Sequence, residues 1–227
     1  MAGKPSKADL NVLGVPQRET LQERVFAELR HALMRGAFAP GSVLQLREVA
    51  ATMGTSPMPV REALRQLVAE HAIEVLPNRA FAVPRISKAV LLDLAATRML
   101  VEGAAAERAA VLAGPSIVAE LRRSNNEMTA AIKAGDRIRL RSANQEFHFA
   151  IYSAANSPVM SNVIETLWLQ AGPYLTLSFA DDSMAPIVLQ NRHEQAIQAI
   201  SRADGEAARI AIAGDISDEM EKILPRV

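Results

Sequence analysis

Leucine and valine recur at every fourth position near the start of the chain, with mostly polar residues between them. These positions are Leu21, Val25, Leu29 and Leu33. The spacing gives a helix one apolar stripe and predicts a helix over about residues 19–35, ending at Gly36. A short helix is expected over about residues 46–53, with Gly54 just after its end. The preceding residues 1–18 are polar with glycine and proline and are predicted to form a flexible tail.

A third helix is predicted to begin abruptly at Ser56, with two prolines in its first turn. Ser56 is a good N-cap residue, which puts Pro57 at the first helical position and Pro59 at the third. Proline costs little there, because the first N–H groups of a helix have no partner inside it. The helix should run to about His71, with an apolar stripe of Val60, Ala63, Leu64 and Leu67. Two short helices joined at Gly54, with another before them, predict a helix-turn-helix.

Apolar residues alternate in the segment that follows, as is typical of strands. The alternating residues are Ile73 and Val75, then Phe81 and Val83, with Pro77, Asn78 and Arg79 between them. This pattern predicts a β-hairpin. A helix-turn-helix followed by a hairpin is a winged helix, and we predict one over residues 19–86.

From Ser87 onward the chain consists of apolar, alanine-rich segments separated by short breaks. Helices are expected over about residues 88–112, 115–134, 136–155, 158–170, 184–201 and 204–223. The breaks are Gly114-Pro115, Gly135-Asp136, Asn156-Ser157-Pro158, the Gly172-Pro173 region and Asp204-Gly205. The predicted fold is therefore mainly α: an N-terminal winged helix-turn-helix and a C-terminal all-helical bundle over residues 87–227.

Composition narrows the class of protein without naming a function. The 227 residues are 49% apolar, include no cysteine and carry no net charge. The absence of cysteine excludes disulfides and thiolate metal sites, and fits a reducing cytoplasm. No apolar run is long enough to span a membrane and no signal core is present, so we expect a cytoplasmic protein.

Charge is distributed unevenly between the two predicted parts. Residues 20–86 hold eight arginines against six glutamates, a balance of +2. Residues 87–227 hold 14 basic against 17 acidic residues, a balance of −3. The contrast permits a local contact with nucleic acid without demanding one.

Three segments of the N-terminal part carry a family resemblance. They read G-A-F-A-P-G-S-V-L at 36–44, L-R-E-V-A-A-T-M-G-T-S-P-M-P-V-R-E-A-L-R-Q-L at 46–67 and L-P-N-R-A-F-A-V at 76–83. This part resembles the winged helix of the GntR family of bacterial transcription regulators. The C-terminal part resembles the FCD-type ligand-binding domain of the FadR-like branch. That second likeness rests on Arg98, Leu100 and Glu102, on F-H-F-A-I-Y-S-A-A-N at 147–156 and on H-E-Q-A-I-Q-A-I at 193–200.

The resemblance implies that the helix begun at Ser56 enters the DNA major groove by its N-terminal end. The implied DNA contacts are Arg47, Ser56, Val60, Arg61 and Arg65, with Asn78 and Arg79 at the wing tip. Arginine suits this role because its fork matches O6 and N7 of guanine. Two departures, Pro57 in place of a common arginine and Ala80 in place of a wing glycine, put the usual operator sequence in doubt.

A solvated helix face is the alternative for the two arginines of that helix, Arg61 and Arg65. Glu62 lies at a spacing that permits an ion pair with Arg65.

By the same resemblance, four positions of the bundle match a set that in the family is commonly one aspartate and three histidines binding a divalent metal. Here they are Asn144, His148, His193 and Asp215. Two imidazoles and a carboxylate suit Zn, Ni or Mn, and Asn144 adds a carbonyl oxygen. The alternative is a site that has lost its metal, in which the two histidines only form hydrogen bonds.

The family likeness also implies an effector, a small organic acid held at the metal. Arg98 would clamp its carboxylate, unless this arginine only forms an ion pair with Glu102. Asn156 matches a family asparagine and would join the effector site, unless it simply caps a helix.

These features together predict a ligand-responsive transcription regulator, usually a repressor, that binds a palindromic operator as a homodimer. A regulator whose C-terminal domain only dimerises is one alternative. A helical-bundle metalloenzyme is another, but no general base or nucleophile lies at readable spacing beside His148, so we do not expect an enzyme.

Overall fold

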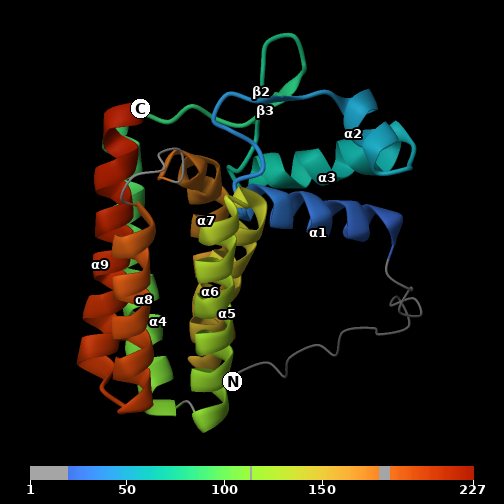
Figure 1. Cartoon of the computed structure of the whole chain (residues 1–227). Coiled ribbons are helices and arrows are strands. Elements are labelled where there is room, and N and C mark those ends of the chain that lie inside the picture. The colour runs from blue at the N-terminus through green and yellow to red at the C-terminus, as the bar shows by residue number, and fades with distance from the viewer. Residues whose placement is uncertain (1–19, 113, 179–184) are drawn as a thin grey trace, which may run out of the picture.

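The computed structural model describes residues 20–112, 114–178 and 185–227. Figure 1 shows two parts, a smaller one of short helices and strands and a bundle of long helices beneath it. The tail predicted for residues 1–18 lies outside the described residues. Within the described part of the chain, no helix combines the length and apolar character needed to cross a membrane.

The smaller part begins with α1 (Leu21–Met34), which is capped at its N-terminus by Thr20. The Thr20 hydroxyl accepts from the backbone N–H of Glu23, and the Glu23 carboxylate accepts from the backbone N–H of Thr20. The short α2 (Leu46–Thr52) and the recognition-type helix α3 (Pro57–Ala69) follow. Gly54 between them has a φ of +63°, a conformation that favours glycine. The predicted helix-turn-helix is confirmed.

Three short strands form the wing, in the order β1-β3-β2 with antiparallel pairing. They are β1 (Val43–Leu44), β2 (Glu74–Val75) and β3 (Phe81–Ala82). The β2–β3 hairpin is as the alternation predicted. The strand β1 was not expected, because two residues are too few to show a period. At the hairpin tip Arg79 has a φ of +63°, and the Asn78 side chain accepts from the backbone N–H of Ala80 over 3.1 Å.

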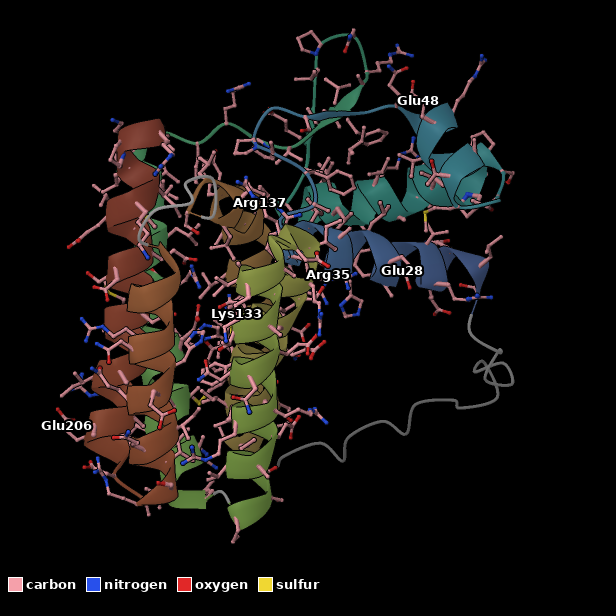
Figure 2. The ribbon with its side chains drawn as sticks, in the orientation of Figure 1. Glu28, Arg35, Glu48, Lys133, Arg137 and Glu206 are labelled. Carbon is pink, nitrogen blue, oxygen red and sulfur yellow. The ribbon has the colours of Figure 1, made fainter. Side chains whose placement is uncertain are left out.

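The larger part is an all-helical bundle. Its helices are α4 (Lys88–Leu112), α5 (Pro115–Ala134), α6 (Arg137–Ala154), α7 (Pro158–Ser178), α8 (Ala185–Ser201) and α9 (Gly205–Ile223), and a 3-10 turn, η2 (Leu224–Arg226), ends the chain. In Figure 2 side chains fill the space between the helices, while the charged groups of Glu28 and Glu206 point outward. The core includes Phe147, Tyr152 and Trp168.

One helix is longer than predicted. The break expected at Gly172-Pro173 is wrong, because α7 continues through both residues to Ser178. A Cβ on Gly172 would lie 2.2 Å from the carbonyl oxygen of Leu33 on α1. The glycine therefore allows close packing between α1 and α7 rather than ending a helix, and α7 continues through Pro173 although a proline removes one hydrogen bond of the helix.

Further contacts connect the winged helix to α7. A Cβ on Gly36, just after α1, would lie 2.6 Å from the carbonyl oxygen of Gly172. The Tyr174 hydroxyl accepts from the backbone N–H of Ile86 over 2.7 Å and donates to the carbonyl of Pro84 over 3.1 Å. The winged helix is thus held against the same helix of the bundle at two places, just after α1 and at its own C-terminal end.

Candidate functional site

A groove of about 980 Å³ lies between α2, α3 and the wing. Four arginines line it: Arg47, Arg61, Arg65 and Arg79. None of the described lining residues carries a carboxylate. Asn78 also lines it. A groove with four guanidinium groups has the electrostatics of a surface that binds phosphate backbones.

The arginines differ in whether they are free to bind. Arg65 forms an ion pair with Glu62, 2.8 Å from Nη1 to Oε1, as the alternative interpretation allowed. Arg47, Arg61 and Arg79 are exposed and make no side-chain hydrogen bond or ion pair with any residue that the structure describes. These three are therefore the groups best placed to meet a ligand in the groove.

The structure at the N-terminal end of α3 corrects one of the predicted DNA contacts. Val60 is 0% exposed and packs in the core, so it cannot reach DNA. The physical reason is that Val60 lies three and four residues before Ala63 and Leu64, on the same buried face of α3. Ser56 is the N-cap by backbone conformation and is exposed, but its hydroxyl makes no capping hydrogen bond. Met58, which the sequence reasoning missed, is 67% exposed in the first turn.

A second candidate site lies inside the bundle. His148 on α6, His193 on α8 and Asp215 on α9 are all buried, and one donor atom from each lies within 4.8 Å of the others. Oδ2 of Asp215 is 3.2 Å from Nε2 of His148 and 3.7 Å from Nε2 of His193. Two donor atoms that share a metal at about 2.0–2.1 Å are separated by about 3–3.5 Å, so the spacing fits a metal.

Protonation in this cluster also suits metal binding. Burial by itself would raise the pKa of Asp215, but the neighbouring His193 and His148 hold that pKa well below its usual range. Burial lowers the pKa of His193, against the opposing charge of Asp215. An ionised carboxylate and a neutral imidazole are the forms that ligate metals.

Several polar atoms of the cluster have no partner. Both ring nitrogens of His193 and Oδ1 of Asn144 are buried without a hydrogen bond to any described residue. The His193 ring stacks on Phe147 with 4.1 Å between centroids, which fixes its orientation. Asn144 lies one helical turn before His148 and so shares its face of α6. Buried orphan groups of this kind require a ligand, an ion or water.

Arg98 is neither a free clamp nor a surface residue. It is buried on α4, with Nε 2.7 Å from Oε1 of Glu102 and Nη1 3.1 Å from Oε2 of Glu219 on α9. Its guanidinium also lies 5.2 Å from the centroid of the Trp168 ring. The ion pair with Glu102 exists, as the alternative interpretation allowed, but it is buried rather than solvated.

The charges around the cluster do not balance among the described residues. Glu102, Asp215 and Glu219 supply three carboxylates against the one guanidinium of Arg98. Burial raises the pKa of Glu219, against the opposing charge of Arg98. When all three are ionised the excess is two negative charges, which one divalent cation would neutralise.

The predicted effector residue Asn156 lies elsewhere. It is exposed, directly after α6, with a φ of +48°. This left-handed conformation ends the helix, which was the ordinary alternative for Asn156, so the structure gives no support to an effector contact there.

Two further residues belong to the buried site, and the sequence reasoning missed both. Tyr152 lies 3.0 Å from Nδ1 of His148 and also donates to Glu102. Glu219 pairs with Arg98. Each follows a predicted ligand by four residues on the same helix, His148 and Asp215 respectively, and that spacing was the available signal.

Comparison with known proteins places both parts in families of transcription regulators. Residues 21–83 match the bacterial regulatory proteins of the gntR family, and residues 93–218 match the FCD domain. The chain is 32% identical over 203 residues to the HTH-type transcriptional regulator McbR of Escherichia coli K12, covering 88% of this chain and 91% of McbR. It is 25% identical over 205 residues to the transcriptional repressor RspR of the same strain, covering 90% of each chain.

Solved structures agree in fold. The structure of Escherichia coli McbR/YncC superposes with a TM-score of 0.82 at 30% identity, covering 91% of this chain and 98% of that one. A GntR transcriptional regulator from Rhodococcus sp. RHA1 gives a TM-score of 0.73 at 22% identity, with coverage of 91% and 98%, and shows the fold alone.

Proposed function

Because the chain belongs to the GntR family of DNA-binding transcription regulators and carries an FCD domain, we propose that it is a metal-dependent, ligand-responsive repressor. It binds a palindromic operator as a homodimer through residues 19–86, and a small organic acid in residues 87–227 controls that binding. The proposal rests above all on the buried His148–His193–Asp215 cluster in a bundle whose α7 also holds the winged helix.

DNA enters the groove between α3 and the wing. Arg61 faces base edges from the recognition helix, and Arg47 on α2 and Arg79 on the wing line the same groove. Pro57 stiffens the first turn of α3, so the exposed N-terminal end keeps a fixed angle to the groove. The Ser56 hydroxyl and the backbone N–H of Met58 suit a phosphate oxygen, whereas Pro57 and Pro59 have no N–H to donate.

His148, His193 and Asp215 would hold the metal, and Oδ1 of Asn144, which is buried without a hydrogen bond, would be available as a neutral donor. Two nitrogens and oxygen donors suit Zn, Ni or Mn. These residues would hold a divalent ion, which would supply a Lewis-acid contact for the carboxylate of an organic acid. The protein contributes a buried setting in which that contact is strong.

A carboxylate effector reaches Arg98 by replacing Glu219. The Glu219 side chain is 15% exposed, whereas Glu102 is 0% exposed and meets Arg98 through both of its oxygens. Glu219 is therefore the partner of Arg98 that can move away. The carboxylate of the effector then takes its place as the negative charge beside Arg98.

The effector site and the winged helix share α7. Trp168 on this helix lies 5.4 Å from His148 between ring centroids, and Gly172 packs against α1. A shift of α7 on ligand binding would move both winged helices of a dimer and change their fit to two half-sites.

A second copy of the chain covers the outer face of α4. Leu92, Ala96, Leu100 and Ala104 follow one another at four-residue spacing on this helix and are all exposed. They form an apolar stripe on the surface, and such a stripe suits a partner helix. A two-fold dimer through α4 would give the pair of winged helices that a palindrome requires.

The test combines metal analysis with DNA binding. Untagged wild-type protein and His148→Ala are analysed for bound metal and titrated against the promoter DNA of the protein's own gene. We expect near-stoichiometric metal in wild type, none in the variant, and DNA binding by wild type that a carboxylate library modulates. Absence of metal from both proteins, with intact DNA binding, would favour the regulator whose C-terminal domain only dimerises.

A further inference from the structure

A continuous line of buried polar contacts runs from α4 to the proposed metal ligands. Arg98 holds both oxygens of Glu102, at 2.7 Å from Nε to Oε1 and 3.5 Å from Nη2 to Oε2. Glu102 accepts from the hydroxyl of Tyr152, and that hydroxyl lies 3.0 Å from Nδ1 of His148. Arg98, Glu102, Tyr152 and His148 are all buried.

The direction of each hydrogen bond follows from the number of protons. The phenol of Tyr152 has one proton to donate, and its oxygen lies within hydrogen-bond reach of both Glu102 and Nδ1 of His148. That proton is given to Glu102, because a carboxylate can only accept. The phenol oxygen can then only accept at His148, so Nδ1 of that ring must carry a hydrogen.

The orientation of His148 has a direct consequence at Nε2. In the neutral ring, Nε2 has no proton and points its lone pair toward Oδ2 of Asp215, 3.2 Å away. Two atoms that both bear lone pairs repel at this distance unless a positive charge lies between them. The contacts on the Nδ1 side thus present Nε2 as a ready ligand for a cation.

We infer that Tyr152 is a positioning residue of the metal centre, which fixes the tautomer and ring orientation of His148 through the Arg98–Glu102 pair. This inference rests on the proposed metal site. Outer contacts of this kind commonly change metal affinity by about 10–100-fold. Tyr152 also connects the metal to Arg98, the proposed anchor of the effector, through side chains alone.

A matched pair of variants separates this role from general packing. Tyr152→Phe removes the hydroxyl from the line of contacts. Tyr174→Phe removes a hydroxyl that also makes two hydrogen bonds, but to the backbone of Pro84 and Ile86. Zinc affinity is measured for wild type and both variants by competition with a fluorescent chelator, and the melting temperature of each metal-free protein is recorded.

We expect Tyr152→Phe to bind zinc about 10–100-fold more weakly than wild type, and Tyr174→Phe to bind it as wild type does. Equal zinc affinity of Tyr152→Phe and wild type would overturn the inference and leave the metal site standing. Wild-type protein that binds no zinc would overturn the metal site as well, so the two failures are distinguishable.

A measurement on wild type alone covers the case in which Tyr152→Phe does not fold. Long-range ¹H–¹⁵N correlation spectra of zinc-loaded protein report which ring nitrogen of each histidine carries hydrogen. A hydrogen on Nδ1 of His148, with Nε2 bound to zinc, supports the inference. Zinc on Nδ1 with a hydrogen on Nε2 would overturn it.

Discussion

Arg30 on α1 and Glu165 on α7 form an ion pair between the winged helix and the bundle, with Nη1 of Arg30 2.8 Å from Oε2 of Glu165. The same guanidinium donates through Nε to Glu70, at the C-terminal end of α3, over 3.2 Å. One side chain thus connects the recognition helix to the helix that borders the proposed metal site. Both carboxylates are partly exposed, which limits the strength of each pair.

Removing one partner of the Arg30–Glu165 ion pair should lower the stability of the fold only slightly. We expect Glu165→Ala to lower the free energy of unfolding by at most about 1 kcal/mol, because a pair in contact with solvent is screened. Urea unfolding of Arg30→Ala, Glu165→Ala and the double variant would give the coupling energy. A loss of several kcal/mol for Glu165→Ala would contradict the partial exposure of the pair.

The backbone contact between α1 and α7 should be far less tolerant. In Gly172→Ala the added Cβ would meet the Leu33 carbonyl oxygen at 2.2 Å and Cα of Met34 at 2.8 Å, and backbone cannot rotate away. We expect a loss of about 1–3 kcal/mol, as for other overpacked sites. Gly114→Ala is the matched control, because a Cβ there meets nothing within 4 Å. Thermal unfolding of the two variants compares them, and equal melting temperatures would rule out the tight contact.

Two arginines of α3 should differ in DNA binding. Arg61 has no side-chain partner among the described residues, whereas Arg65 is paired with Glu62. Arg61→Ala should weaken operator binding by about 1–3 kcal/mol, as expected for a base contact. Arg65→Ala should weaken it less. Fluorescence anisotropy with labelled operator DNA at fixed salt measures both, and an unchanged affinity for Arg61→Ala would remove it from the interface.

Metal removal should lower stability in wild type but not in a ligand variant. A ligand that binds only the folded state stabilises it by about 4 kcal/mol at a thousand times its dissociation constant. Scanning calorimetry with zinc, and again after chelation, should therefore show a large difference in melting temperature for wild type. His148→Ala should show none, and a zinc-dependent shift retained in this variant would place the metal elsewhere.

The outer face of α4 should control oligomeric state. Leu100 is 75% exposed at the centre of the apolar face, and Leu100→Glu would put a charge into the proposed interface. We expect the variant to elute as a monomer in size exclusion with light scattering, and to lose affinity for a palindrome. Ile210→Glu on α9 is the control, since Ile210 is also exposed, at 53%, but lies off this face. A dimeric Leu100→Glu protein would direct attention to another surface.

Sequence pattern predicted most helices because each depends on local periodicity and on caps such as Asp136 and Asp204. The prediction of a helix break at Gly172-Pro173 was wrong. Gly172 packs against the end of α1, and this contact with a segment far away in sequence leaves no local pattern. For Val60 the local pattern was right and the predicted DNA contact was wrong. Its place in an apolar stripe already predicted burial, and the family resemblance should not have overridden that pattern.

At the buried site, the resemblance identified His148, His193 and Asp215, and the structure brings them together from three helices. The contacts between different helices in this network could not be assigned from the sequence. Tyr152 meets Glu102 across 50 positions of sequence, and Arg98 meets Glu219 across 121. Spacing along one helix can suggest that two residues share a face, but it cannot say which face of another helix they meet.

Trp168 and Gly172 are four residues apart on α7, so about 6 Å of rigid helix separates the side chain beside His148 from the backbone against Leu33. No loop or flexible side chain lies between these two points. A displacement of Trp168 would therefore be carried along this helix to its contact with α1, and so to the winged helix that bears Arg61. In a dimer on two half-sites about 34 Å apart, a change in the angle of each winged helix would alter the fit to DNA.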